Sequence, residues 1–166
     1  MTMDDGADRP DISRPLGVPP PASSETTRRV MRANRRRDTG PELRLRKALR
    51  DAGIKGYRVD YAKAPGRPDI CFVGKRLAVF VHGCFWHRCP LCSPSTPKTN
   101  SDFWALKFAK NTERDVHKRR ELEAAGWTVL IAWECRIRED TAEVVAQVAT
   151  LLGREPAPPQ REDTTS

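Results

Sequence analysis

The sequence predicts a mixed α/β fold in which helices cover the faces of a central β-sheet. Three short segments rich in strand-forming residues follow one another between residues 56 and 82. Segments with helical spacing precede and follow them, and one more strongly apolar segment lies between the later helices. The predicted order is therefore helix, three strands, helix, strand, helix, without an internal repeat.

The first helix is predicted to begin at Thr39, because Thr39 and Glu42 have the spacing of a capping box. Gly53 should end it. The apolar residues of this helix recur at intervals of three or four, which defines one buried face: Leu45, Ala48, Leu49 and Ala52.

The three strands are expected at 56–60, 69–73 and 76–82. A tight turn at Gly74-Lys75 should join the second strand to the third, so that the two pair as neighbours. We expect Cys71, inside the second strand, to be a small core residue.

The remainder of the fold is expected to consist of a loop at 83–100, a long helix at 101–125, a strand at 127–133 and a last helix from Thr141 to Leu152. Ser101 and Thr141 are the expected helix caps. The strand at 127–133 is so apolar that we place it at the centre of the sheet. The basic residues of the long helix are expected to lie mainly on its solvated face, and phosphate contacts by some of them are the alternative: Lys107, Lys110, Arg114, Lys118, Arg119 and Arg120.

The two ends of the chain differ in composition from the middle. Eight of the 14 prolines lie in 1–27 and 153–166, and these ends have net charges of −3 and −1. Segments so poor in apolar residues bury too little surface to offset the entropy of ordering. We therefore predict disordered tails at 1–27 and 153–166 and one working domain at 28–152. This domain has a net charge of +12, whereas the whole chain, with its acidic ends, has +8.

The positive charge is concentrated at the start of the domain. The segment 28–50 contains ten basic residues, nine of them Arg, against only Asp38 and Glu42. Guanidinium groups suit phosphate oxygens, so the cluster favours nucleic-acid binding over a merely solvated helix face. No apolar run approaches the length that crosses a bilayer, and the N-terminal segment has no apolar stretch of signal-peptide length.

Three of the five cysteines lie within nine residues, in the pattern Cys84-x4-Cys89-x2-Cys92. A CxxC pair with a third thiol nearby predicts a tetrahedral structural Zn²⁺ site. The favoured fourth ligand is Cys135, which follows the last strand, and His87 is the competing candidate. Free buried thiols or a redox CxxC are the alternatives, although prolines after Cys92 do not suit the helix that normally follows a redox motif.

An acidic residue at the edge of the predicted hairpin suggests a second metal site. Asp69 follows the turn Pro65-Gly66-Arg67-Pro68, which would hold its carboxylate rigidly near solvent, as Mg²⁺ requires. If the two strands pair through the Gly74 turn, the backbone near Val81 and the ring of His82 approach Asp69. A lone Asp before a strand is more often a turn residue, so this motif is weak alone.

Phe85 and Trp86 form a pair of adjacent aromatics that cannot both face one core. One alternative is that one ring is buried and the other packs under the cysteine loop. The other is that the pair is a wedge that enters a base stack.

These motifs occur in an order that resembles the very short patch repair (Vsr) endonucleases, and the string HGCFWH at 82–87 is the most specific of them. The resemblance covers about 28–138 and is carried by Met31-Arg32-Ala33-Asn34, Arg37-Asp38-Thr39-Gly40-Pro41-Glu42, Pro65-Gly66-Arg67-Pro68-Asp69, Val81-His82-Gly83-Cys84-Phe85-Trp86-His87, Asn111-Thr112-Glu113-Arg114-Asp115, Gly126-Trp127 and Trp133-Glu134-Cys135.

The resemblance implies a restriction-endonuclease-like fold and a catalytic site. Asp69 and the main-chain carbonyl of Val81 would bind Mg²⁺, and Glu42 would belong to the network of metal-bound water. His87 would be the general base or water-positioning group, with His82 nearby. Two departures are Val81, where the family often has Thr, and the spacing of the second and third zinc ligands.

The resemblance also implies how DNA is held. Met31, Phe85 and Trp86 match the intercalating residues of the family, and Cys84, Cys89, Cys92 and Cys135 match its zinc site. Phosphate contacts are expected from the basic cluster: Arg28, Arg29, Arg32, Arg35, Arg36 and Arg37.

The predicted function is a Mg²⁺-dependent endonuclease that nicks one strand of double-stranded DNA, 5′ to the T of a T:G mismatch. Such mismatches arise when 5-methylcytosine deaminates, and the nick would initiate very short patch repair. The alternatives are a restriction-type nuclease of matched duplex and a zinc-braced DNA-binding protein without catalysis. The expected setting is the cytoplasm, at the nucleoid, as a monomer that cooperates with other mismatch-repair proteins and a repair polymerase.

Overall fold

A computed structural model of the chain describes residues 10–19, 21 and 37–154. The helices are α2 (Gly40–Asp51), α3 (Cys84–His87), α4 (Ser101–Ala124), α5 (Glu134–Glu139) and α6 (Thr141–Leu151). The strands are β1 (Arg58–Val59), β2 (Ile70–Phe72), β3 (Leu77–His82) and β4 (Thr128–Trp133), and a short 3-10 helix, η1 (Val73–Lys75), joins β2 to β3.

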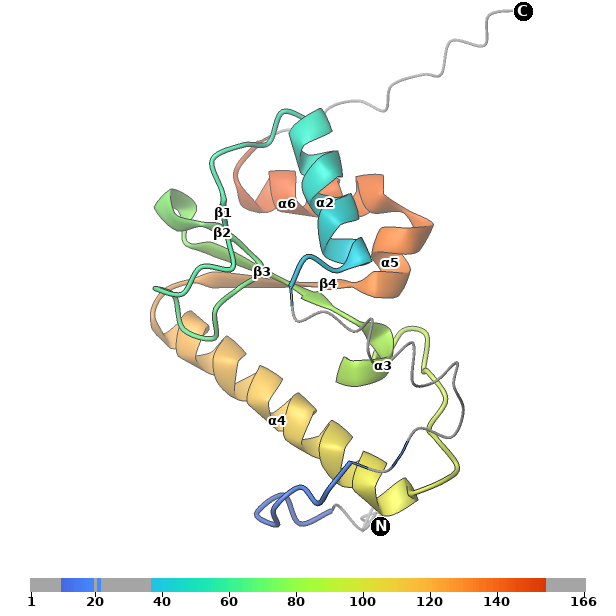
Figure 1. Ribbon diagram of the computed structural model, residues 1–166. Helices are drawn as coiled ribbons and strands as arrows, with labels where there is room; N and C mark the ends of the chain where they lie inside the picture. The colour runs from blue at the N-terminus through green and yellow to red at the C-terminus, as the bar shows by residue number, and fades with distance from the viewer. Residues whose placement is uncertain (1–9, 20, 22–36, 155–166) are drawn as a thin grey trace, which may run out of the picture.

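The predicted mixed sheet with flanking helices is confirmed, and it is consistent with a restriction-endonuclease-like fold. The strand order is β1-β2-β3-β4; β1, β2 and β3 are antiparallel neighbours, and β3 and β4 run parallel. Helix α4 is the crossover between the two parallel strands, as this topology requires. Figure 1 shows α2, α5 and α6 on one face of the sheet and α4 on the other.

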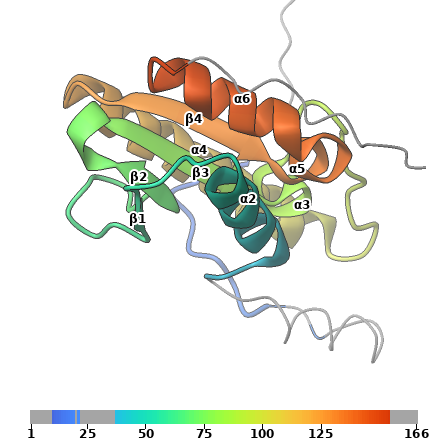
Figure 2. The same ribbon diagram turned by 90° about the horizontal axis from the view of Figure 1, so that it is seen from above.

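The prediction that 127–133 forms the central strand is wrong. β4 lies at the edge of the sheet, and β3 is the interior strand between β2 and β4. The apolar character of β4 has another cause, which is that helices cover both of its faces: Leu130 and Ala132 pack into the cluster with α6, whereas Val129 and Ile131 pack into the cluster with α4. Figure 2, seen from above, shows α6 lying along this strand.

Two short helices were not predicted. α3 lies inside the expected loop at 83–100, and α5 follows β4 directly. With four and six residues, neither is long enough for a hydrophobic period to show. The caps also differ: Asn100 and Asp140 precede α4 and α6, and a carboxylate oxygen of Asp140 accepts a hydrogen bond from the N–H of Glu143.

Alternation along β3 decides what each face of the sheet receives. Leu77 and Val79 are buried in the core with α2 and α6, whereas Ala78 and Phe80 face α4. His82 continues the second set, so its ring is directed to the α4 side. β3, the interior strand, therefore ends in a histidine on the face that α4 covers.

Candidate active site

A pocket of about 390 Å³ opens between the end of β3, the start of α2 and the middle of α4. It brings together residues that are far apart in the sequence. Its titratable lining includes Glu42, Asp69, His82, His87, Asp115 and Lys118. The four residues predicted to be catalytic, which are Asp69, His87, His82 and Glu42, therefore line one pocket.

Asp69 lies immediately before β2 begins, beside the last residues of β3. The predicted hairpin brings it to Val81, whose backbone N–H donates a hydrogen bond of 2.7 Å to Asp69 Oδ2. The carboxylate thus accepts the hydrogen bond from Val81 that the backbone of a neighbouring strand would otherwise accept. Burial, together with the smaller effect of the Glu42 charge, raises the pKa of Asp69 from 3.8 to about 6 despite this hydrogen bond.

Glu42 is a buried carboxylate held by its own helix start. The Thr39 hydroxyl donates to Oε1 at 2.8 Å and the Asp38 N–H donates to Oε2 at 2.9 Å. Thr39 is the N-cap as predicted, but its hydroxyl bonds to Glu42 rather than to the helix backbone. Two carboxylates beside one pocket repel each other, so the pair suits a divalent cation that would satisfy both.

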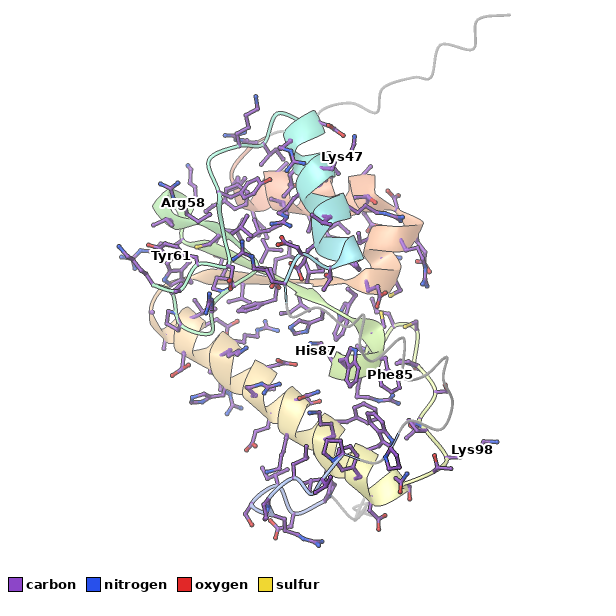
Figure 3. The ribbon with its side chains drawn as sticks, in the orientation of Figure 1. Lys47, Arg58, Tyr61, Phe85, His87 and Lys98 are labelled. Atoms are coloured by element: carbon purple, nitrogen blue, oxygen red, sulfur yellow. The ribbon has the colours of Figure 1, made fainter. Side chains whose placement is uncertain are left out.

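The two histidines stack against each other. The rings of His82 and His87 are nearly parallel, with centroids 4.0 Å apart. Burial and then the neighbouring His87 lower the pKa of His82 from 6.5 to about 4, so this ring is neutral at pH 7. Figure 3 shows His87 on α3 with Phe85, between the end of β3 and α4.

His87 has a partner that the sequence analysis did not find. Its Nδ1 lies 2.5 Å from Oδ2 of Asp115 on α4. Burial alone would raise the pKa of Asp115, but the hydrogen bond and charge of His87 outweigh burial and hold the pKa below its usual value. An ionised Asp115 orients the ring so that Nδ1 donates to it and Nε2 is left as an acceptor.

A sequence signal for Asp115 does exist in the inward stripe of α4. Trp104, Phe108 and Asn111 are buried, and Asp115, Lys118 and Leu122 continue the same helical spacing. Asn111 is polar because its side-chain N–H donates to the Trp86 carbonyl at 3.0 Å and so holds α3 against α4. The stripe turns polar where it passes beneath the pocket.

Phe85 and Trp86 are both half-buried and both point to α4. Phe85 packs edge-on against Trp104 and Phe108, at centroid distances of 5.7 and 5.2 Å. Trp86 lies 6.1 Å from Trp104 and also lines the pocket. The two rings therefore share an aromatic cluster at one rim of the site.

The cysteine motif closes into one cluster. The sulfur atoms of Cys84, Cys89, Cys92 and Cys135 all lie within 4.8 Å of one another, and those of Cys89 and Cys135 are 3.8 Å apart. Thiolates about 2.3 Å from a tetrahedral Zn²⁺ are separated by about 3.8 Å, so the donor set and its spacing fit this metal. His87, the competing ligand, is instead engaged with Asp115.

The thiols of this cluster do not behave alike. Burial raises the pKa of Cys84 and of Cys135. Burial would raise that of Cys89 too, but the backbone N–H groups of Cys92 and Leu91 outweigh it and lower the pKa. Cys71 is buried in β2, apart from the cluster, as expected for a core residue.

Most of the predicted DNA-contacting residues lie outside the described part of the chain: Met31, Arg28, Arg29, Arg32, Arg35 and Arg36. Arg37 is described and exposed, and its guanidinium lies 3.4 Å from both Asp38 and Asp60. Within the predicted N-terminal tail, the Ile12 carbonyl accepts a hydrogen bond of 2.7 Å from Lys110 on α4. No helix in the described residues combines the length and apolar composition needed to cross a membrane.

Comparison with known proteins gives a consistent result. The family model of DNA mismatch endonuclease Vsr matches residues 22–91. The chain is 42% identical over 113 residues to the DNA mismatch endonuclease Vsr of Escherichia coli K12, which covers 68% of this chain and 72% of that protein. It is 42% identical over 129 residues to the type II nicking enzyme V.NaeI of Lentzea aerocolonigenes, covering 75% of each chain. It is 36% identical over 130 residues to V.XorIIP of Xanthomonas oryzae pv. oryzae, covering 78% of this chain and 94% of that one.

Fold, pocket and relatives together define a DNA endonuclease, an enzyme that hydrolyses phosphodiester bonds. This excludes the hypothesis of a DNA-binding protein without catalysis. The chain belongs to the DNA mismatch endonuclease Vsr family, which confirms the resemblance drawn from the HGCFWH motif.

Proposed function

We propose that the enzyme nicks one strand of double-stranded DNA 5′ to the T of a T:G mismatch that arises by deamination of 5-methylcytosine. The nick would initiate very short patch repair. The observation that carries the proposal is the convergence of Asp69 and the His87–Asp115 pair on one pocket whose rim is aromatic. The relatives named as mismatch endonucleases and nicking enzymes support the choice of substrate.

Asp69 and the carbonyl of Val81 are the proposed ligands of a catalytic Mg²⁺, with Glu42 holding metal-bound water. The raised pKa of Asp69 supports this assignment, because a buried carboxylate pair is relieved by a cation. Bound at this point, Mg²⁺ would neutralise charge on the phosphate and lower the pKa of a coordinated water.

His87 is the proposed proton acceptor, in preference to His82. A ring with a pKa of about 4 is a weak base at neutral pH, which argues against His82. The Asp115 carboxylate favours the tautomer of His87 that leaves Nε2 free and stabilises the ring once it is protonated. His82 then acts as the surface on which the His87 ring stacks.

Met31, Phe85 and Trp86 are the proposed wedge that opens the base stack. A mismatched pair unstacks at lower cost than a matched one, so a wedge selects for mismatches. Trp86 lines the pocket and Phe85 packs edge-on against it, so an inserted Trp86 ring would adjoin the reacting phosphate. The phosphates on either side would be held by the basic cluster that begins at Arg28.

A structural Zn²⁺ bound by Cys84, Cys89, Cys92 and Cys135 would tie α3 to the start of α5. The fold suggests its purpose, since Cys84 begins the helix that carries Phe85, Trp86 and His87. Cys92→Ser should lower the zinc content measured by atomic absorption well below one per chain. Cys71→Ser is the matched control, because Cys71 lies outside the cluster, and equal zinc loss in both would contradict the assignment.

For the cellular setting we propose action as a monomer in the cytoplasm, at the nucleoid. Other mismatch-repair proteins and a repair polymerase would complete the patch after the nick.

The proposed function is tested by a strand-resolved nicking assay with Mg²⁺ on duplexes that differ only in one pair, T:G, T:A or C:G, in varied flanking sequence. A single nick 5′ to the mismatched T, absent in Asp69→Asn, is expected. Cleavage of matched duplex at a similar rate would support a restriction-type nuclease of the same fold instead.

A further inference from the structure

Lys118 is a basic residue of α4 that differs from the solvated surface expected for this helix. It is half-buried and lines the pocket, whereas Arg119 and Arg120 beside it are exposed. It lies three residues after Asp115 and four before the buried Leu122, on the inward stripe. Its position on the helix thus directs a cation into the active site.

The stem of Lys118 is held by the turn that carries Asp69. Gly66 adopts φ +69°, and a Cβ at that residue would lie 2.8 Å from Cβ and 2.9 Å from Cγ of Lys118. Only a glycine allows so close an approach of the two segments. The same contact fixes the lysine stem beside the backbone that leads to Asp69.

The charge of Lys118 acts on the site but is not neutralised there. Burial has the largest influence on the pKa values of Asp69, His82 and Asp115, and Lys118 is among the charges that shift all three. Among the described residues, no carboxylate oxygen lies within 4.0 Å of its ammonium group, although ion pairs are formed by Arg37, Arg46, Arg67, Arg119 and Arg136. A cation placed this way is available to an anionic ligand.

We propose that Lys118 is a catalytic residue whose ammonium group contacts a non-bridging oxygen of the scissile phosphate. This deepens the proposed function and rests on it only in taking a DNA phosphodiester as the substrate. The attacking water adds negative charge to the phosphoryl oxygens in the transition state, so a fixed cation there stabilises the transition state more than the ground state. Lys118 would approach the phosphate from α4, beside the turn that leads to Asp69.

The test pairs a protein change with a DNA change. Lys118→Met removes the charge but retains the stem, Lys118→Arg retains the charge, and Lys47→Met is the control, since Lys47 is exposed on α2 away from the pocket. The wild-type cut is first mapped, and a second duplex then has one uncharged methylphosphonate at that position. Binding is measured by fluorescence anisotropy in EDTA, and single-turnover nicking of the native duplex is measured with Mg²⁺.

We expect Lys118→Met to slow nicking about 100-fold and Lys118→Arg to lie within tenfold of wild type. Lys118→Met should weaken binding of the native duplex about tenfold and leave binding of the methylphosphonate duplex unchanged. Lys47→Met should affect both duplexes equally. If Lys118→Met weakens both duplexes equally, or nicks at the wild-type rate, the proposed contact is wrong.

The same experiment separates this inference from the proposed function. If the wild type cuts matched duplex, the mismatch specificity fails, and the Lys118 comparison is made at the position of that cut. If the wild type nicks at T:G but the effects of Lys118→Met and of the methylphosphonate on binding are additive, the proposed function stands and the lysine contact fails. If the wild type nicks neither the T:G duplex nor a matched duplex, both the proposed function and the lysine contact are overturned.

Discussion

The two faces of the central sheet are built for different purposes. The face under α2, α5 and α6 is an uninterrupted apolar core that includes Leu45, Ile70 and Val148. The face under α4 has a much smaller apolar cluster and then, along the same helix, turns to Asn111, Asp115 and Lys118. Glu42 reaches the pocket from the start of α2, but the rest of that face contributes to stability and the α4 face to chemistry, so mutations on the two faces should separate stability from activity.

Asp69→Asn should have the largest effect on activity of the substitutions that distinguish the two faces. Nicking should fall by at least about 1000-fold, because the carboxylate that would bind Mg²⁺ is lost. Stability should rise: the pKa of Asp69 is about 6 in the fold against an ordinary value of 3.8, so the folded state loses stability as pH rises from 4 to 6. At pH 7.5 this cost is about 3 kcal/mol.

Asn can still accept the hydrogen bond from Val81 without carrying a charge. Thermal unfolding in EDTA should therefore give a higher Tm for Asp69→Asn than for wild type at pH 7.5, and a difference close to zero at pH 3.5. A lower Tm for the variant at pH 7.5 would show that the carboxylate is not destabilising in the fold.

Asp115→Asn sharpens the comparison with an intermediate effect. The carboxylate orients His87 and stabilises its protonated ring, so we expect nicking to slow by about 10- to 100-fold. DNA affinity in EDTA should change less than threefold. Combining Asp115→Asn with His87→Ala should cost little more than His87→Ala alone, and an additive double variant would mean that the two side chains act separately.

Leu45→Ala on the opposite face should have the smallest effect on nicking. Leu45 is fully buried in the core between α2 and the sheet, so its truncation should lower the free energy of unfolding by about 2–5 kcal/mol. Single-turnover nicking by the folded fraction should stay within twofold of wild type. Urea unfolding measures the loss of stability, and the nicking assay measures the activity. A nicking rate tenfold below that of wild type would mean that the α2 face positions the pocket as well.

The sequence alone predicts the sheet, the long helices and the approach of Asp69 to Val81, because these depend on local patterns and on one hairpin. The position of β4 could not be predicted in the same way, because an apolar run indicates that both faces of a strand are buried but not where the strand lies in the order of the sheet. The stripe that begins at Trp104 places Asp115 and Lys118 on the inward side of α4, but their partners are known only once the packing of this helix is known. These partners are distant in the sequence, since Asp115 lies 28 positions from His87 and Lys118 contacts the turn at Gly66.

The zinc-ligand cluster also has a consequence for how the chain folds. Cys84 and Cys135 are 51 positions apart, and the segment between them contains all of α4, the crossover that connects β3 to β4. Parallel pairing across so long a connection is slow, because the loop entropy is lost before the contacts are gained. If Zn²⁺ binds as proposed, it would join the ends of the two strands and hold this crossover closed, so the metal would act on the yield of folded chains and not on the hydrolysis itself.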